Sequence, residues 1–425
     1  MGIMVDEVVE PLSIRKNFLW NTAGCLVYQG CQWAITVVVV ILSANYENSG
    51  MLAFAMSVGN VFSTIATYNV RTYQVSDVLN RFTSSNYVAF RCLTLMVAFV
   101  LVGFYLGAIV SQALIPTVFC YLLFKADESF CNVLYGMDQK AQRMDYIGVS
   151  QAARGALTLM SFSVILFLTQ DLNLAILGMS ALCIAVTFLY DRKRAEKLGQ
   201  IIPSISLAKA KELFVTCFPA VVTLCCFGLV VMIARQVFEN MRGAEALGIY
   251  AAVATPTVIV QVASSYLYAP FISKIAKDWA DARVKEVLRT LTSVTALIAI
   301  VFVLIFVASF AFGDKLLVLV FGQRIADYTY LLMPALFATA CAAFVGFFLD
   351  VLIVFRNMKG ALLANLLSAI TSALVIAPAI DRFGMNGVNI AIIVSFGVGI
   401  ALSIVFLLIS FYQKVPPPER GKRVK

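Results

Sequence analysis

The sequence of 425 residues contains no histidine at all. Histidine is the most common general base in enzymes and the most common metal ligand, so its absence excludes histidine-based catalytic triads and histidine-ligated metal sites. The ten cysteines form no CxxC pair and are scattered through apolar runs, where cysteine usually serves as a small hydrophobic side chain. We therefore expect no catalytic residues, no metal, no cofactor and no enzymatic activity.

Charged residues are also scarce, at 13%, whereas hydrophobic residues make up 61% of the chain. A soluble protein carries roughly a quarter charged residues, and this chain has too few to build a water-exposed surface. Its mean hydropathy of +0.91 indicates that lipid is the solvent for most side chains. The net charge of +9 does not predict nucleic-acid binding, because the basic residues lie in short segments between apolar runs.

Apolar runs of about 20 residues, enough to cross a hydrocarbon layer of roughly 30 Å, recur along the chain. They predict an all-α polytopic membrane protein with about 12 transmembrane helices. The first run lacks a small-residue cleavage site, so we interpret it as a retained helix rather than a signal peptide. The expected helices lie at residues 17–42, 51–75, 87–109, 113–136, 146–168, 173–190, 213–238, 247–272, 288–312, 329–354, 361–380 and 386–412.

The distribution of lysine and arginine predicts the orientation of these helices. Twelve crossings place both termini on one side; of the 32 Lys and Arg residues, 25 fall on that side, four on the opposite side and three within helices. The positive-inside rule therefore predicts a multi-pass protein of the cell (inner or plasma) membrane with both termini in the cytoplasm. The basic stretch 273–289 is typical of an amphipathic segment at the membrane surface.

A faint internal repeat suggests that the chain has two halves. With an offset of about 198 residues, Gly50-Met-Leu-Ala aligns with Gly248-Ile-Tyr-Ala, each at the start of the second helix of its half. We expect a six-helix lobe over residues 1–200, a second over residues 201–412, a central cavity between them and a basic cytoplasmic tail at residues 413–425.

Charged residues within the expected helices are candidates for function, because a charge is costly at membrane depth. Asp127 and Arg154 both lie roughly 12–13 Å from the cytoplasmic face at 1.5 Å per residue, so we expect them to meet. One interpretation is a structural ion cluster of zero net charge, and the other is a ligand site in the cavity. The cluster would contain Lys125, Asp127, Glu128 and Arg154.

Two further helix charges are ambiguous in the same way. Arg235 has Glu239 four residues further on, a spacing that favours an interfacial ion pair. Asp350 lies close to Arg356 in the sequence and is a candidate for an ion-coupling or orienting role. Arg71, Arg91 and Arg143 gather near the cytoplasmic mouth of the first half, where they either bind phosphate oxygens or serve as positive-inside anchors.

Several segments resemble the polysaccharide transporter family, which contains O-antigen and capsule repeat-unit flippases, within the multidrug/oligosaccharidyl-lipid/polysaccharide exporter superfamily. The resemblance implies a two-lobed, V-shaped bundle whose cationic cavity opens alternately to each leaflet. Arg71, Lys125 and Arg154 would then face the pyrophosphate and sugar of the substrate, and Asp127 and Glu128 would orient them or couple to an ion. The segments are FLWNTAGCLVYQGCQW (18–33), GMLAFAMSVGNVFSTIATYNVRTYQVSD (50–77), YGMDQKAQRMDYIGVSQAARG (135–155) and LGIYAAVATP (247–256).

The function implied by this resemblance is translocation of polyprenyl-pyrophosphate-linked oligosaccharide from the cytoplasmic to the outer leaflet, for surface polysaccharide (lipopolysaccharide or capsule) biosynthesis. Its partners would be the lipid-linked oligosaccharide, membrane lipids, a polysaccharide polymerase and glycosyltransferases. A multidrug or small-molecule antiporter is the alternative within the superfamily, although the first helix lacks the carboxylate that this branch typically uses. A membrane-integral polysaccharide-assembly enzyme fits less well, because the expected external loops are short. A channel or passive scaffold fits the hydropathy, and only the charges buried in the first half oppose it.

Overall fold

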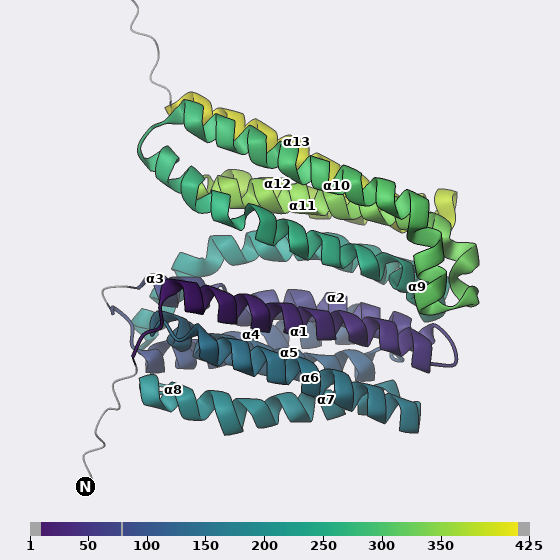
Figure 1. Ribbon diagram of the computed structural model, residues 1–425, viewed down its shortest axis with the longest axis horizontal. Coiled ribbons are helices and arrows are strands. Elements are labelled where there is room, and N and C mark those ends of the chain that lie inside the picture. The colour runs from purple at the N-terminus through teal and green to yellow at the C-terminus, as the bar shows by residue number, and fades with distance from the viewer. Residues whose placement is uncertain (1–9, 78–79, 415–425) are drawn as a thin grey trace, which may run out of the picture. The chain divides into compact units, whose positions relative to one another are not determined.

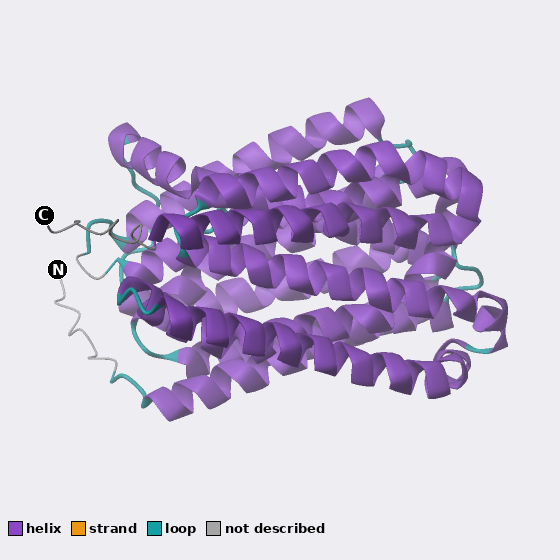
Figure 2. Cartoon of the chain, turned by 90° about the horizontal axis from the view of Figure 1, so that it is seen from above, coloured by secondary structure: helices purple, strands orange, loops and turns teal. Residues whose placement is uncertain are grey.

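The computed structural model describes residues 10–77 and 80–414. All regular secondary structure in these residues is helical (Figure 2). The all-α fold predicted from hydropathy is therefore confirmed. Of the predicted cytoplasmic tail, residues 415–425 lie outside the described residues.

The first part of the chain forms helices that follow the predicted spans closely (Figure 1). Apolar runs form helices here because, inside a bilayer, a helix satisfies all of its backbone hydrogen bonds within one segment. The elements are α1 (Ile14–Leu42), α2 (Glu47–Thr67), α3 (Val70–Ser76), α4 (Ser84–Ile109), α5 (Ile115–Lys140), α6 (Met144–Thr169), α7 (Leu172–Val186), the π-helical turn η1 (Thr187–Asp191) and α8 (Arg192–Leu198).

The second part begins with a helix that contains a break. Gly243 has φ +84° and ψ 168°, values outside the helical region, so α9 consists of two segments that meet at this residue. Glycine adopts a positive φ without the steric penalty that a Cβ would bring. The elements are α9 (Leu207–Ala280), α10 (Val284–Phe321), the 3-10 helix η2 (Gln323–Leu331), α11 (Leu332–Val354), α12 (Met358–Phe383), the 3-10 turn η3 (Gly384–Asn386) and α13 (Gly387–Lys414).

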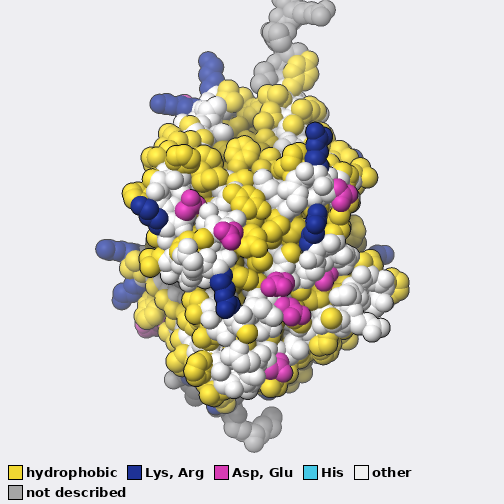
Figure 3. Space-filling view, turned by 90° about the vertical axis from the view of Figure 1, so that its right-hand side faces the viewer, with side chains coloured by type: hydrophobic (Ala, Val, Ile, Leu, Met, Phe, Trp, Pro, Cys, Tyr) yellow, Lys and Arg dark blue, Asp and Glu magenta, His cyan; other side chains and the backbone are white. Residues whose placement is uncertain are grey.

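These elements account for the predicted number of crossings. Nine helical stretches of the described chain are long and apolar enough to span a membrane. Met358–Gln413 holds two predicted crossings, because it contains both α12 and α13. The predicted crossing 247–272 lies in α9 beyond the break at Gly243, and only its first residues belong to the stretch Leu207–Ala254. The helix α5 is the remaining predicted span, and its buried charges lower its hydropathy. Many apolar side chains along these helices are exposed, as expected for contact with lipid. Figure 3 looks onto the helix ends at the right-hand side of Figure 1, where Lys, Arg, Asp and Glu side chains lie among apolar ones.

The structure corrects two details of the prediction. The expected helix 51–75 is interrupted, because Tyr68 and Asn69 adopt left-handed conformations with φ of 49° and 50° and separate α2 from α3. The stretch 273–289 is not a separate surface helix. It is the end of α9, a tight turn and the start of α10, and Ala282 in that turn has φ 57°.

The described residues divide into two compact units, one formed by those up to residue 255 with 320–322 and the other by residues 256–319 with those from 323 onward. In the first unit, α1 packs along α6, α6 along α7, and α2 along α5. In the second unit, α13 packs against both α11 and α12. The lobes predicted at 1–200 and 201–412 rest on the sequence repeat, and their boundary stays a prediction.

Candidate functional site

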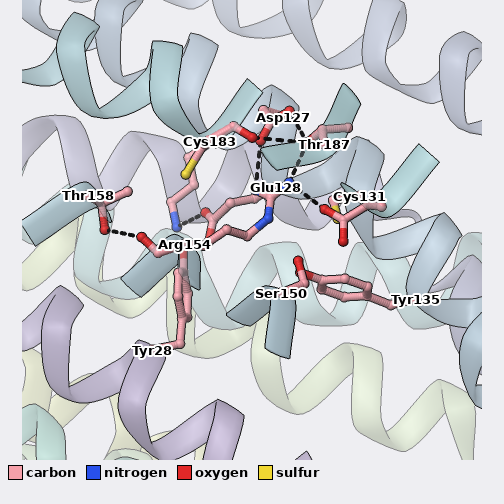
Figure 4. Close-up of polar contacts among 12 residues, drawn as sticks. Tyr28, Asp127, Glu128, Cys131, Tyr135, Ser150, Arg154, Thr158, Cys183 and Thr187 are labelled. Atoms are coloured by element: carbon pink, nitrogen blue, oxygen red, sulfur yellow. Dashed lines mark hydrogen bonds and ion pairs between the residues drawn. The ribbon is translucent and has the colours of Figure 1, made fainter. Parts of the chain in front are cut away.

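A buried arginine lies at the centre of the first unit. Arg154 of α6 is only 3% exposed, and its Nη1 atom lies 2.7 Å from a carboxylate oxygen of Asp127 on α5. Thr187 links the pair, because its hydroxyl accepts a hydrogen bond from Arg154 and donates one to Asp127 at 2.6 Å (Figure 4). The predicted proximity of Asp127 and Arg154 is therefore confirmed.

The sequence did not predict the second acid at this arginine. Asp191 lies 3.1 Å from Nη2 of Arg154, and its side chain is as buried as that of the arginine. The residue precedes the basic run RKR and therefore resembles the start of a cytoplasmic loop in the sequence. The π-helical turn Thr187–Asp191 continues α7 with a wider turn and places both Thr187 and Asp191 at Arg154.

This second acid changes the charge of the predicted cluster. The two cations Lys125 and Arg154 now have three carboxylates near them instead of two, because Asp191 joins Asp127 and Glu128. The expectation of zero net charge is wrong, since full ionisation gives an excess of one negative charge. Arg154 is thus held by two acids at once, and its charge is fully compensated by direct contacts.

The other half of the predicted cluster is a separate pair. Nζ of Lys125 lies 2.6 Å from Glu128, which also accepts a hydrogen bond from the hydroxyl of Tyr28 on α1. The ammonium group lies 5.6 Å from the ring centre of Tyr121. Gly59 of α2 makes room for this arrangement, because a Cβ there would lie 2.7 Å from the Tyr121 ring. The predicted cluster is therefore two adjacent ion pairs.

A cavity of about 220 Å³ lies beside these pairs, within the first unit. Its lining contains two arginines, one carboxylate and several amide and hydroxyl side chains, a mixture suited to a polar, anionic ligand. The lining residues are Tyr28, Ser63, Thr67, Arg71, Glu128, Ser129, Cys131, Asn132, Tyr135, Gln151 and Arg154.

Arg71 differs from Arg154 in the way its charge is satisfied. Its Nε atom donates to the amide oxygen of Gln139 at 3.0 Å, and its guanidinium lies 5.8 Å from the ring centre of Tyr135. Within the described part of the chain, no carboxylate forms an ion pair with Arg71. Arg71 is therefore the cavity cation whose guanidinium is available for an incoming anion.

Arg91 does not line this cavity. It is fully buried and donates to the carbonyl oxygen of Ala66 and, at 3.3 Å, to Asn132. Ala66 lies in the last turn of α2, where carbonyl groups lack helical partners, so Arg91 caps the end of this helix. It also orients Asn132, whose side chain does line the cavity.

The other predicted residues lie outside the cavity. Arg143 forms a bidentate pair with Asp145 at 2.9 and 2.8 Å and stacks on Tyr146, with 3.9 Å from the guanidinium carbon to the ring centre. Lys125 is behind the lining, where it contacts Glu128. Asp350 belongs to the second unit, in the neighbourhood of Tyr268.

The ion pair expected between Arg235 and Glu239 is not formed. Arg235 donates to the carbonyl oxygen of Ala53 on α2 at 2.9 Å, and one carboxylate oxygen of Glu239 is buried without a hydrogen-bond partner. Sequence spacing alone predicted the pair, but the close packing of α2 on α9 offers Arg235 a backbone acceptor instead. As for metals, no group of three Cys, Asp or Glu side chains in the described chain is arranged to hold an ion.

The chain is a multi-pass membrane protein, and the solved structures that it resembles are transporters. The lipid II flippase MurJ, in an inward closed conformation, matches with a TM-score of 0.68 and 10% identity over 93% of this chain and 90% of that one. An inward-facing multidrug resistance MATE family transporter of the MOP superfamily matches with a TM-score of 0.66 and 9% identity over 90% of this chain and 94% of that one.

These likenesses show that the chain has the fold of the MOP superfamily transporters. The predicted resemblance to this exporter superfamily is confirmed at the level of the fold. By sequence, the capsular polysaccharide biosynthesis protein CapF of Staphylococcus aureus is 23% identical over 323 residues, which cover 75% of this chain and 80% of that protein. No protein-family model matches the chain.

Proposed function

We propose that this protein is a flippase that moves a polyprenyl-pyrophosphate-linked oligosaccharide from the cytoplasmic to the outer leaflet by alternating access. The observation that carries the proposal is the position of Arg71 and Arg154 in the lining of one cavity, together with amide and hydroxyl side chains. Guanidinium groups bind phosphate oxygens through paired hydrogen bonds, and amides and hydroxyls suit sugar hydroxyls. The similarity to CapF and to MurJ supports a lipid-linked polysaccharide precursor as the substrate class.

The two arginines have different roles in this proposal. Arg71 meets the pyrophosphate first, because it forms no ion pair, whereas Arg154 is held by Asp127 and Asp191. A substrate phosphate that approaches Arg154 competes with these carboxylates, so binding at Arg154 is weaker and reversible. Asp127 holds Arg154 in place, and Glu128 at the cavity lining holds Lys125. Arg91 supports the cavity through Asn132, and Arg143 anchors the end of α6.

The proposed setting is the plasma membrane, with both termini in the cytoplasm and with glycosyltransferases and a polysaccharide polymerase as partners. The bias of lysine and arginine toward one side of the predicted spans supports this orientation. The protein itself performs no covalent chemistry in this proposal, since binding and conformational change suffice for flipping.

The test is reconstitution into liposomes with a fluorescent polyprenyl-pyrophosphate oligosaccharide and an impermeant enzyme outside that acts on the exposed sugar. We expect protein-dependent exposure that falls at least about tenfold in Arg71→Gln, because a charge-assisted hydrogen bond is lost. The matched control is Arg192→Gln, which removes the same charge from an exposed pair with Glu196. Equal flipping rates for Arg71→Gln and Arg192→Gln would show that Arg71 does not bind the substrate.

A second candidate function is antiport of small cations or drugs. The observation that favours it is Glu128, a carboxylate in the cavity lining, together with the fold likeness to a multidrug MATE transporter. The same liposomes, loaded with a fluorescent organic cation, distinguish the two functions. Cation efflux that requires Glu128, in vesicles that flip no lipid-linked sugar, would favour the antiporter.

A further inference from the structure

A second polar cavity lies in the second unit, at the end where α9 and α13 finish and α12 begins. Its volume is about 810 Å³, and its lining contains two cations and no carboxylate. By the predicted topology this end faces the cytoplasm. The lining residues are Ala276, Trp279, Ala280, Val354, Phe355, Arg356, Asn357, Lys359, Gly360, Phe406, Ile409, Ser410 and Gln413.

The two cations, Arg356 and Lys359, are exposed and form no ion pair with a carboxylate in the described part of the chain. By contrast, Arg283 in the turn between α9 and α10 contacts Asp278 at 3.8 Å and Asp281 at 3.3 Å. A cavity with two uncompensated positive charges attracts an anion, and none of the described lining residues is a carboxylate.

Aromatic and aliphatic side chains form the rest of this cavity. The indole of Trp279 stacks on Phe355 with 3.7 Å between ring centres, and Phe411 packs edge-on against both rings. Ile409 lines the cavity and is 42% exposed, so apolar surface continues from the lining to the lipid-facing side. Trp side chains favour the region between headgroups and acyl chains.

Asn357 fixes the geometry of the polar end. Its side chain caps α12 by accepting a hydrogen bond from the backbone amide of Gly360 at 2.9 Å and donates to Ser410 of α13 at 3.0 Å. This network links the turn that carries Arg356 and the first turn of α12, which carries Lys359, to the end of α13. The network therefore fixes the backbone from which the two cations extend.

We propose that this cavity binds the phosphate group of an anionic phospholipid from the cytoplasmic leaflet, with Arg356 and Lys359 as the phosphate ligands and the Trp279 surface beside the glycerol region. Basic pockets between transmembrane helices on the cytoplasmic side suit such headgroups. A soluble anion would contact only the basic part of the lining, whereas a phospholipid would contact the basic part with its phosphate and the apolar part with its glycerol and acyl region. The site is separate from the transported substrate and does not depend on its identity.

Tryptophan quenching tests this assignment directly. The chain has three tryptophans, so Trp20→Phe/Trp33→Phe leaves Trp279 as the sole reporter in the full-length protein. In mixed micelles, we expect brominated phosphatidylglycerol to quench Trp279 at a mole fraction on the order of tenfold lower than brominated phosphatidylcholine. Equal quenching by the two lipids would overturn the proposal.

Charge variants then distinguish a specific phospholipid site from a general electrostatic attraction of anionic lipids to the protein. We expect Arg356→Gln/Lys359→Gln to abolish the preference and Lys359→Gln alone to reduce it. Lys274→Gln/Lys277→Gln removes two charges from the end of α9 outside the lining and should retain the preference. An equal loss in this control pair, or relief of quenching by millimolar inorganic pyrophosphate, would refute a specific phospholipid site.

Discussion

Gly50 of α2 and Gly248 of α9 pack backbone against backbone, with no side chain between them. A Cβ on Gly50 would lie 2.9 Å from the amide nitrogen of Gly248, and a Cβ on Gly248 would lie 2.8 Å from that of Gly50. The hydroxyl of Ser49 also donates to the carbonyl oxygen of Gly248 at 3.4 Å. The sequence repeat aligns these same two glycines. The contact therefore joins positions that are equivalent in the two halves of the repeat, each at the start of the second predicted helix of its half.

This contact predicts that alanine is not tolerated at Gly50. The added methyl group must push α2 and α9 apart, and overpacking of this kind costs about 1–3 kcal/mol. We expect Gly50→Ala to lower the midpoint of thermal unfolding in detergent. Gly103→Ala in α4 is the matched control, because a Cβ there meets no atom within 4 Å. If both variants unfold at the same temperature, the two helices are not in close contact.

A second prediction concerns the acid that follows α3. Asp77 is buried, which raises its pKa, but hydrogen bonds from the amides of Phe82 and Arg81 and from the hydroxyl of Tyr87 outweigh this effect, so its pKa lies below the ordinary value of 3.8. The ionised carboxylate therefore stabilises the fold at neutral pH.

This stabilisation is fully present above the unfolded-state pKa and is lost as the pH falls through the lower folded-state pKa. We expect Asp77→Asn to unfold at a lower temperature than the wild type at pH 7, with a difference that is constant down to about pH 5 and shrinks below about pH 4. Unfolding scans of both proteins across this range provide the measurement. A difference that grows on acidification would show that Asp77 does not have a lowered pKa.

The helices could be predicted because each crossing needs a long apolar run, and such runs are visible in a single sequence. The interruption at Tyr68 and Asn69 could not, because it depends on two left-handed residues within a stretch that is compatible with a continuous helix. The ring of Tyr68 packs on Phe90 and Phe214, with ring centres 5.6 and 4.8 Å apart, so distant residues stabilise this turn.

The candidate site was predicted in part for similar reasons. Counting residues from the membrane face was enough to predict that Asp127 and Arg154 meet, since helix rise converts sequence position into depth. Asp191 was missed because the π-helical turn changes which side chains face inward. The partner of Arg91 was missed because it is a backbone carbonyl, which no residue type reveals.

Arg91 and Arg71 provide a third prediction, because both were expected to bind substrate and only Arg71 lines the cavity. Arg91→Gln removes the hydrogen bond from the arginine to the carbonyl oxygen of Ala66 and leaves the one from Thr94. We expect the free energy of unfolding to fall by about 1–3 kcal/mol, the cost of disrupting a buried hydrogen-bond network. We expect flipping per folded molecule to fall much less than in Arg71→Gln, because Arg91 acts on the cavity only through Asn132. Arg71→Gln should show the reverse, with a near-normal unfolding midpoint and reduced flipping. Loss of flipping in stably folded Arg91→Gln would place Arg91 in the binding site.

The last prediction separates a structural role of Arg154 from a transport role. Arg154→Ala leaves Asp127 and Asp191 buried without their cation, and breaking a buried ion pair in this way costs about 3–5 kcal/mol. We expect the variant to unfold at a much lower temperature than the wild type. Neutralising the acids as well, in Arg154→Ala/Asp127→Asn/Asp191→Asn, should restore most of the stability, because no unpaired charge remains.

Transport by the triple variant is the decisive measurement. If Arg154 binds the substrate pyrophosphate, restored stability will not restore flipping, since the phosphate ligand is still missing. If the network only stabilises the fold, the triple variant will flip lipid-linked sugar at nearly the wild-type rate. Asp127→Asn/Asp191→Asn with Arg154 intact completes the comparison, because an arginine without its acids should bind pyrophosphate more tightly and release it more slowly. An unpaired buried arginine also destabilises the fold, so flipping is compared per folded molecule. A fall on that basis, although the binding cation is present, is a result that a purely structural network does not predict.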